Sequence, residues 1–158
     1  PRSMSVGEPG RLSGLTIGAG VLSQGAAYGT VVDVGEHHVR ILPLLNTAGT
    51  WSCRLGRNGP VSPMTWDGKS PTTLQLKDVP RYAEASAGDT VYTSGFDLHF
   101  PDGVPVGIVE ETITSSGSDF KTVLVRPALT FSSVRHLQYL QHSLQAEREA
   151  LARPLEGP

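Results

Sequence analysis

The sequence has few charged residues, few aromatic residues and almost no cysteine. Charged residues make up 18% and aromatic residues 6% of the 158 positions, and Cys53 is the single cysteine. One cysteine excludes an internal disulfide and a cysteine-rich zinc site. The formal net charge is −2, and no basic stripe alternates with aromatic residues, so we expect no nucleic-acid partner.

Long apolar runs are also missing. No stretch approaches the roughly 20 apolar residues that a membrane helix requires, and no signal-peptide pattern is present. The first residues, Pro1, Arg2, Ser3 and Met4, are typical of a tag remnant in front of an internal segment. We therefore expect the chain to be a fragment of a longer protein.

Turn-forming residues, in contrast, are plentiful. The chain has 18 glycines and 12 prolines, and these divide it into short β-branched or alternating runs. The expected strands are residues 28–34, 39–45, 51–55, 64–66, 72–77, 91–94, 104–110 and 120–126. Residues 35–38 form a plausible hairpin turn, and Pro43 places its strand at an edge or ends it. The pattern predicts an all-β protein made of small barrels or a sandwich.

The two ends of the chain differ from this pattern. Residues 1–13 are polar and glycine-rich and are predicted to be a disordered arm. Near the C-terminus, leucines recur at spacings of three, four and seven residues, which fits a short amphipathic helix over about residues 143–153. The stripe is too short for a coiled coil alone. Residues 141–158 are therefore predicted to be a helical or disordered tail.

A serine hydrolase is the alternative function that the residues allow. His37 or His38, then Asp67 or Asp78, then Ser94 follow the histidine, aspartate and serine order of one protease class. The sequence around Ser94 lacks the glycine two positions earlier that nucleophile motifs carry. A turn-capping or buried hydroxyl is the simpler interpretation of this serine.

The remaining candidate chemistry is weak. The histidines lack the spacing of metal ligands, and the glycine-rich residues 14–20 lack the lysine of a phosphate loop. Glu110 and Glu111 alternate across a strand, which does not suit an acid–base pair. Scattered aromatic residues give little sign of a carbohydrate-binding module. We expect no catalytic residue, no metal and no cofactor.

Three large apolar side chains stand out because their segment reads as a loop. These are Phe96, Leu98 and Phe100. They either plug the end of a barrel or form an exposed apolar patch that binds a partner. Both alternatives stay open at the level of sequence.

A combination of motifs resembles the MreC family of rod-shape-determining proteins. Residues 88–95 read G-D-T-V-Y-T-S-G, and residues 100–107 read F-P-D-G-V-P-V-G. Residues 29–35 and 120–128 add two further matches. The structural residues of the motif are Gly88, Asp89, Thr93, Ser94, Gly95, Pro101, Gly103, Pro105 and Gly107. Pro105 and Gly107 inside a valine-rich strand are expected to create a bend or a bulge. Residues 51–77 and the tail match the family poorly.

The resemblance implies a fold of two small, six-stranded-like β-barrels with a chymotrypsin-like barrel topology. In such proteins one barrel combines early and late strands. This implies a discontinuous first domain of residues 14–48 and 109–140 and a second domain of residues 49–108.

The resemblance also implies a function. Such proteins are non-enzymatic scaffolds of cell-wall elongation that maintain rod shape. They are anchored in the bacterial inner membrane, and this part lies in the periplasm. The implied partners are a second copy of the chain in a dimer or higher assembly, penicillin-binding protein 2, MreD, RodA and, through a cytoplasmic end, MreB.

Overall fold

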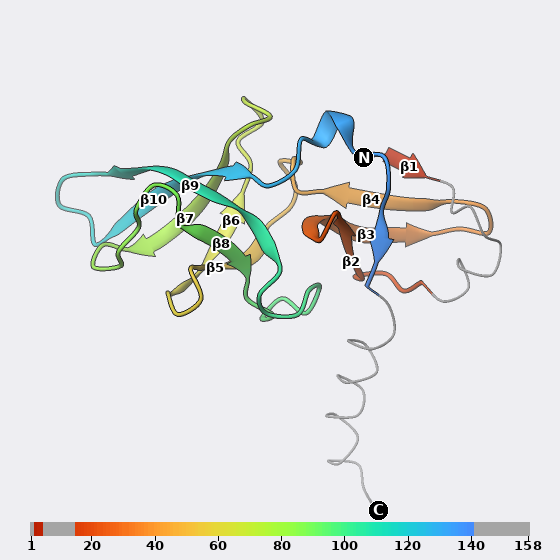
Figure 1. Ribbon diagram of the computed structural model, residues 1–158, viewed down its shortest axis with the longest axis horizontal. Helices are drawn as coiled ribbons and strands as arrows, with labels where there is room; N and C mark the ends of the chain where they lie inside the picture. The colour runs from red at the N-terminus through yellow and green to blue at the C-terminus, as the bar shows by residue number, and fades with distance from the viewer. Residues whose placement is uncertain (1, 5–14, 141–158) are drawn as a thin grey trace, which may run out of the picture.

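The computed structural model describes residues 2–4 and 15–140, which form two antiparallel β-structures side by side (Figure 1). The first is a five-stranded sheet, and the second is a closed six-stranded barrel. In spatial order the sheet contains β1 (Arg2–Met4), β4 (Val39–Pro43), β3 (Ala26–Val34), β2 (Gly20–Ser23) and β11 (Gln138–Tyr139). Around the barrel run β10 (Phe120–Pro127), β7 (Leu74–Pro80), β6 (Val61–Thr65), β5 (Trp51–Leu55), β8 (Thr90–Thr93) and β9 (Pro105–Thr114).

Alternation of side chains fills the barrel. In β5, the buried residues Trp51, Cys53 and Leu55 alternate with half-buried neighbours, because successive side chains of a strand point to opposite faces. Met64, Leu76 and their neighbours on the other strands complete this core. A second apolar cluster, which includes the fully buried Val21 and Ile41, belongs to the sheet.

The sheet rests against the barrel through a few shared residues. Ala27 on β3 and Leu44, just beyond β4, are buried within the barrel's apolar cluster. The chain leaves the sheet after β4, builds the whole barrel and returns through a short 3₁₀ turn, η2 (Phe131–Ser133), to β11 (Figure 1). The barrel is thus inserted between two parts of the sheet.

The all-β class predicted from sequence is confirmed. The predicted hairpin turn also forms, with the N–H of Gly35 donating to the carbonyl oxygen of His38 at 2.8 Å, and β4 ends at Pro43. Of the two predicted barrel units, one closes into a six-stranded barrel. Among the described residues, the other unit is an open five-stranded sheet.

The predicted boundary at residue 108 falls inside β9. This strand pairs with β8 on one side and β10 on the other, so both β9 and β10 close the barrel. Residues 109–127 therefore belong with residues 51–108 and not with the sheet. Only the segment after β10 returns to the sheet, where β11 pairs with β2.

The arm predicted over residues 1–13 also needs a correction at its start. Arg2–Met4 form β1, which pairs with β4. Backbone pairing along a strand edge requires no side-chain periodicity, so the sequence pattern carried no signal for it. The rest of the arm and the predicted helical tail lie outside the described residues.

Candidate functional site

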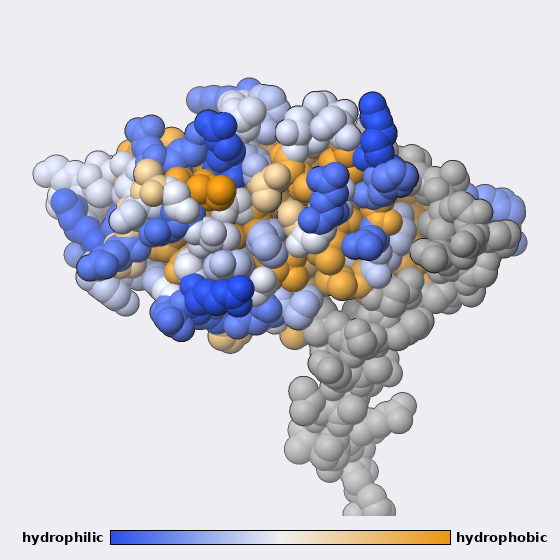
Figure 2. All heavy atoms as spheres, in the orientation of Figure 1, coloured by the Kyte–Doolittle hydropathy of each residue, from blue (hydrophilic) through white to orange (hydrophobic). Residues whose placement is uncertain are grey.

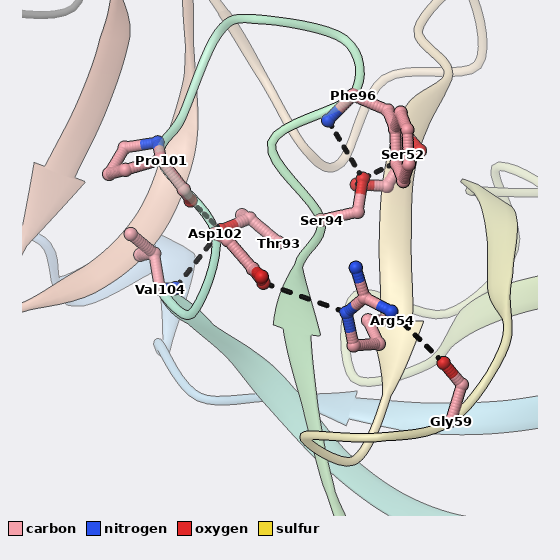
Figure 3. A network of polar contacts seen from close by, with 9 residues as sticks. All are labelled: Ser52, Arg54, Gly59, Thr93, Ser94, Phe96, Pro101, Asp102 and Val104. Atoms are coloured by element: carbon pink, nitrogen blue, oxygen red, sulfur yellow. Dashed lines mark hydrogen bonds and ion pairs between the residues drawn. The ribbon is translucent and has the colours of Figure 1, made fainter.

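The segment that connects β8 to β9 carries four of the nine motif residues, Ser94, Gly95, Pro101 and Gly103, and lies where the barrel meets the sheet. We call residues 94–103 the junction loop. Figure 3 shows Ser94 and Asp102 of this loop directed toward Ser52 and Arg54 of β5. The loop contains all three residues of the predicted apolar patch, so its geometry decides which of them a partner can reach.

Thr93, the last residue of β8, closes the base of the loop. Its hydroxyl donates to the carbonyl oxygen of Pro101 at 2.6 Å and accepts from the N–H of Val104 at 3.0 Å (Figure 3). The backbone adds a bond from the N–H of Gly103 to the carbonyl oxygen of Thr93 at 2.9 Å. A buried hydroxyl that both donates and accepts fixes the two ends of the loop against each other.

Ser94 has a structural role. Its hydroxyl lies 2.8 Å from the hydroxyl of Ser52 and 3.1 Å from the Ser52 carbonyl oxygen, and it accepts from the N–H of Phe96 at 3.1 Å. The side chain is buried. The imidazole that lies in the same loop, His99, is hydrogen-bonded to the carbonyl oxygen of Gly18. The serine therefore caps a turn, as its simpler interpretation had it.

Asp97 ties the loop to β5 from the other side. Its carboxylate accepts from the N–H of Ser52 at 2.8 Å and from the N–H of His99 at 3.3 Å. Cys53 lies next to Ser52 on β5 and is fully buried. Burial raises the pKa of the Cys53 thiol, and the negative charge of Asp97 raises it further. The thiol therefore stays protonated and unreactive in the folded protein.

The far side of the loop contacts the sheet. His99 Nδ1 lies 2.7 Å from the carbonyl oxygen of Gly18. A Cβ atom added at Gly20 would collide with the carbonyl oxygen of His99 and with the ring of Phe100. Glycine at position 20 therefore allows the loop to approach β2 closely, and this contact sets the barrel against the sheet.

The three apolar residues of the predicted patch separate in the structure. Phe100 is 1% exposed and belongs to the barrel's core, so the plug alternative holds for this residue and a partner cannot reach its side chain. Phe96 is 70% exposed. Leu98 is 36% exposed, and its φ of 68° lies in the left-handed region. Phe96 and Leu98 remain the candidate contact residues.

The other motif residues shape the turns around the loop. Gly88, Gly95 and Gly103 have positive φ values, a conformation that other residues adopt at a cost. Asp89 accepts through its carboxylate from the N–H of Ser86 at 2.9 Å. Opposite Pro105 and Gly107, the β8–β9 register shifts between Val91 and Tyr92, which is the expected bulge.

Sequence reasoning missed the polar contacts that brace the loop from β5. The Nε atom of Arg54 lies 3.6 Å from the carboxylate of Asp102, and its Nη1 donates to the carbonyl oxygen of Gly59 at 3.2 Å (Figure 3). Arg54 lies in the region that resembles the family poorly, so the motif gave no signal for it. Alternation along β5 was the one available indication, since it points Arg54 away from the core.

The part of the chain that the structure describes contains no helix long and apolar enough to cross a membrane. Within the same residues, no three histidine, cysteine or acidic side chains gather as a metal-binding group. The junction loop presents the exposed side chain of Phe96 above a buried polar network.

Comparison with known proteins assigns the family. The family described as "Rod shape-determining protein MreC, barrel core" matches residues 7–141. The chain belongs to the MreC family. Members are structural, non-enzymatic proteins, which agrees with the capping role of Ser94. The cell shape-determining protein MreC of Haemophilus influenzae is 27% identical over 139 residues, which cover 88% of this chain and 39% of that protein. The chain thus spans about two fifths of the length of this MreC relative.

Solved MreC structures share the fold. MreC from Pseudomonas aeruginosa is 25% identical with a TM-score of 0.74, and the match covers 89% of this chain and 99% of that one. MreC from Helicobacter pylori, solved in complex with penicillin-binding protein 2, is 24% identical with a TM-score of 0.67 over 85% and 83% of the two chains. A structure described as the major periplasmic domain of the cell shape-determining filament MreC is 23% identical with a TM-score of 0.64 over 80% and 77%.

Proposed function

We propose that this chain is the periplasmic part of a membrane-anchored scaffold in the cell-wall elongation machinery, and that it binds penicillin-binding protein 2 through the junction loop. The observation that carries the proposal is an exposed aromatic side chain on a rigid support within a cell-shape-determining family. Phe96 is 70% exposed, while the residues on both sides of it are held by Ser52.

A rigid support matters for affinity. A flexible loop loses conformational freedom when a partner binds it, whereas a preorganised loop has little freedom left to lose. Aromatic side chains that fill a pocket of the partner supply much of the binding energy of protein interfaces. The H. pylori MreC that was solved with penicillin-binding protein 2 supports this choice of partner.

Self-association is the second part of the proposal. Among the described residues, the sheet ends in two short strands, β1 and β11, each paired on one side only. Such edges offer unpaired backbone groups to another chain. The relative described as a filament supports this part. MreD, RodA and, through a cytoplasmic end, MreB complete the proposed set of partners.

The test is binding of the purified chain to the periplasmic part of penicillin-binding protein 2 from the same organism, measured by biolayer interferometry. We expect saturable binding, weakened about tenfold or more by Phe96→Ala because an aromatic anchor is lost. Phe120→Ala is the matched control, since Phe120 is another exposed phenylalanine but lies on β10. Equal affinity of the wild type and Phe96→Ala would reject the loop as the contact site, and no binding at all would reject this partner for the chain.

A further inference from the structure

A hollow on the sheet side of the molecule is built from residues that the junction loop does not use. It has a volume of about 310 Å³. One wall is the turn between β2 and β3, with Ser23 and Gln24. The other wall is the segment over residues 128–136, which we call the return segment because it leads from the barrel back to the sheet.

The return segment is anchored from beneath. Leu129 is buried in the apolar cluster of the sheet, and the ring of Phe131 lies 5.4 Å from the ring of Tyr28. At the start of the segment, the N–H of Ala128 donates to the carbonyl oxygen of Val106 at 2.9 Å. These contacts hold the wall of the hollow in place before any ligand arrives.

The opposite wall is a tight turn. Gln24 and Gly25 are the two central residues between the paired positions Ser23 and Ala26, with φ values of 51° and 78°. Hairpin turns of this kind favour asparagine or glycine at the first central position. A glutamine in this left-handed conformation costs backbone energy, and Gln24 is one of the residues that line the hollow.

The residues that line the hollow carry hydrogen-bond donors but no carboxylate. The lining contains one guanidinium, that of Arg135, one imidazole, that of His136, and the Gln24 amide. Three hydroxyl-bearing residues, Ser23, Thr130 and Ser133, complete the polar part, and the Ser133 hydroxyl donates to the carbonyl oxygen of Thr130 at 3.1 Å. None of the lining residues carries a carboxylate, and no ion pair with Arg135 occurs within the described residues. The hollow is therefore rich in hydrogen-bond donors and carries positive charge.

A second polar hollow shows what a compensated arginine looks like. Arg57, Tyr92 and Asp102 line a smaller space of about 100 Å³. There the guanidinium of Arg57 lies over the ring of Tyr92, 4.6 Å from its centre, and the carboxylate in the lining, that of Asp102, pairs with Arg54. Arg57 therefore has an aromatic partner within the chain, whereas no such partner of Arg135 occurs among the described residues.

We propose that the hollow of the return segment binds the oxyanion of a small molecule, a phosphate or a carboxylate. Arg135 is the main recognition residue, because a guanidinium pairs with either group through two parallel hydrogen bonds. The Ser23 and Thr130 hydroxyls and the Gln24 amide supply further donors. The volume is at the lower end of the range for small-molecule sites, so the ligand is larger than the oxyanion alone.

The experiment is a titration of the ¹⁵N-labelled chain followed by NMR. Inorganic phosphate and acetate are the probes, with sodium chloride at matched ionic strength as the reference. We expect saturable shifts of the Ser23, Gln24 and Ser133 amides with at least one probe and only small linear drifts with chloride. The probe that saturates identifies the oxyanion, phosphate or carboxylate.

Two variants make the result specific. Arg135→Gln is expected to weaken the probe about tenfold, since a charge-assisted hydrogen bond is lost. Arg57→Gln, in the compensated hollow, should leave the affinity unchanged. Non-saturating shifts with both probes, or equal affinity of Arg135→Gln and the wild type, would overturn the proposal. Because Arg57 and Arg135 are both exposed, both variants are expected to fold, which the dispersion of the same spectra checks directly.

Discussion

The barrel and the sheet differ in how the edges of their strands are paired. In the barrel every strand pairs on both sides, and the interior is filled by the chain's larger apolar cluster. The sheet has two edges and a smaller cluster, and Ala27 and Leu44 are buried against the barrel. On the face drawn in Figure 2, hydrophobic residues reach the surface mostly over the middle of the molecule. The barrel therefore pairs all its strands and encloses its own core, whereas the sheet is stabilised in part by packing against the barrel.

The largest effect is expected from a cavity in the barrel. Leu76→Ala removes a fully buried side chain and should lower the free energy of unfolding by about 2–5 kcal/mol. Because Ala27 and Leu44 of the sheet region pack into the barrel's apolar cluster, amides of both regions should lose protection in hydrogen exchange. The matched change is Ile41→Ala in the sheet, where Ile41 is equally buried. It should expose β3 and β4 while β6 and β7 stay protected. Retained protection of β3 in Leu76→Ala would contradict this dependence.

A smaller effect is expected at the contact between the two regions. Gly20→Ala introduces a Cβ that meets the backbone of His99 and the ring of Phe100. Overpacking of this kind costs about 1–3 kcal/mol. Hydrogen exchange should show loss of protection in β2 and in the junction loop, with little change in β6 and β7. Urea unfolding that matches the wild type would mean that the loop does not need this close approach.

The smallest effect concerns Cys53 and depends on pH. Burial raises its pKa in the folded protein, while the unfolded thiol ionises near about 8.5. The folded Cys53 thiol therefore keeps its proton at pH values at which the unfolded thiol has lost it. Its contribution to the free energy of unfolding is fully present below the pKa of the unfolded thiol and is lost as the pH rises above it. As the pH rises above it, the free energy of unfolding should fall by at most about 1.4 kcal/mol per pH unit.

Urea midpoints measured between about pH 7 and pH 9.5 check this slope, because most lysines and tyrosines titrate above that window. Cys53→Ala removes the thiol and should flatten the curve. The same slope in the variant and the wild type would assign the pH dependence to other groups. A thiol reagent gives a second measurement, since native Cys53 should react only after unfolding.

Strands bounded by turn residues were predictable, and the reason is local. In β5 and β10 the alternation and the adjoining glycine or proline lie within a few residues of each other. β2 was missed because Gly20–Ser23 is short and starts in a glycine-rich run, and because Gln24–Gly25 is an unusual pair for a two-residue turn. The assignment of β9 and β10 to the barrel was missed because the pairing of β9 with two strands depends on contacts distant in sequence.

The candidate site was predictable in its position but not in its detail. The motif placed the loop and its glycines correctly along the chain. Phe96 and Phe100 look alike in sequence, yet one is exposed and the other is buried. The difference arises because β2 packs over position 100, a contact that joins residues about 80 positions apart. The return-segment hollow had no sequence signal at all, because its two walls meet only in the folded protein.

The insertion of the barrel into the sheet has a mechanical consequence. The backbone passes between the two bodies twice, at residues 44–50 and again at residues 128–137 (Figure 1). A body held by one tether swivels freely, but a body held by two separate tethers resists torsion. A twist applied to the barrel is therefore transmitted to the sheet through covalent bonds as well as through packing. The two connections therefore transmit to the sheet the orientation of a molecule that is bound to the barrel, and not only the fact that it is bound.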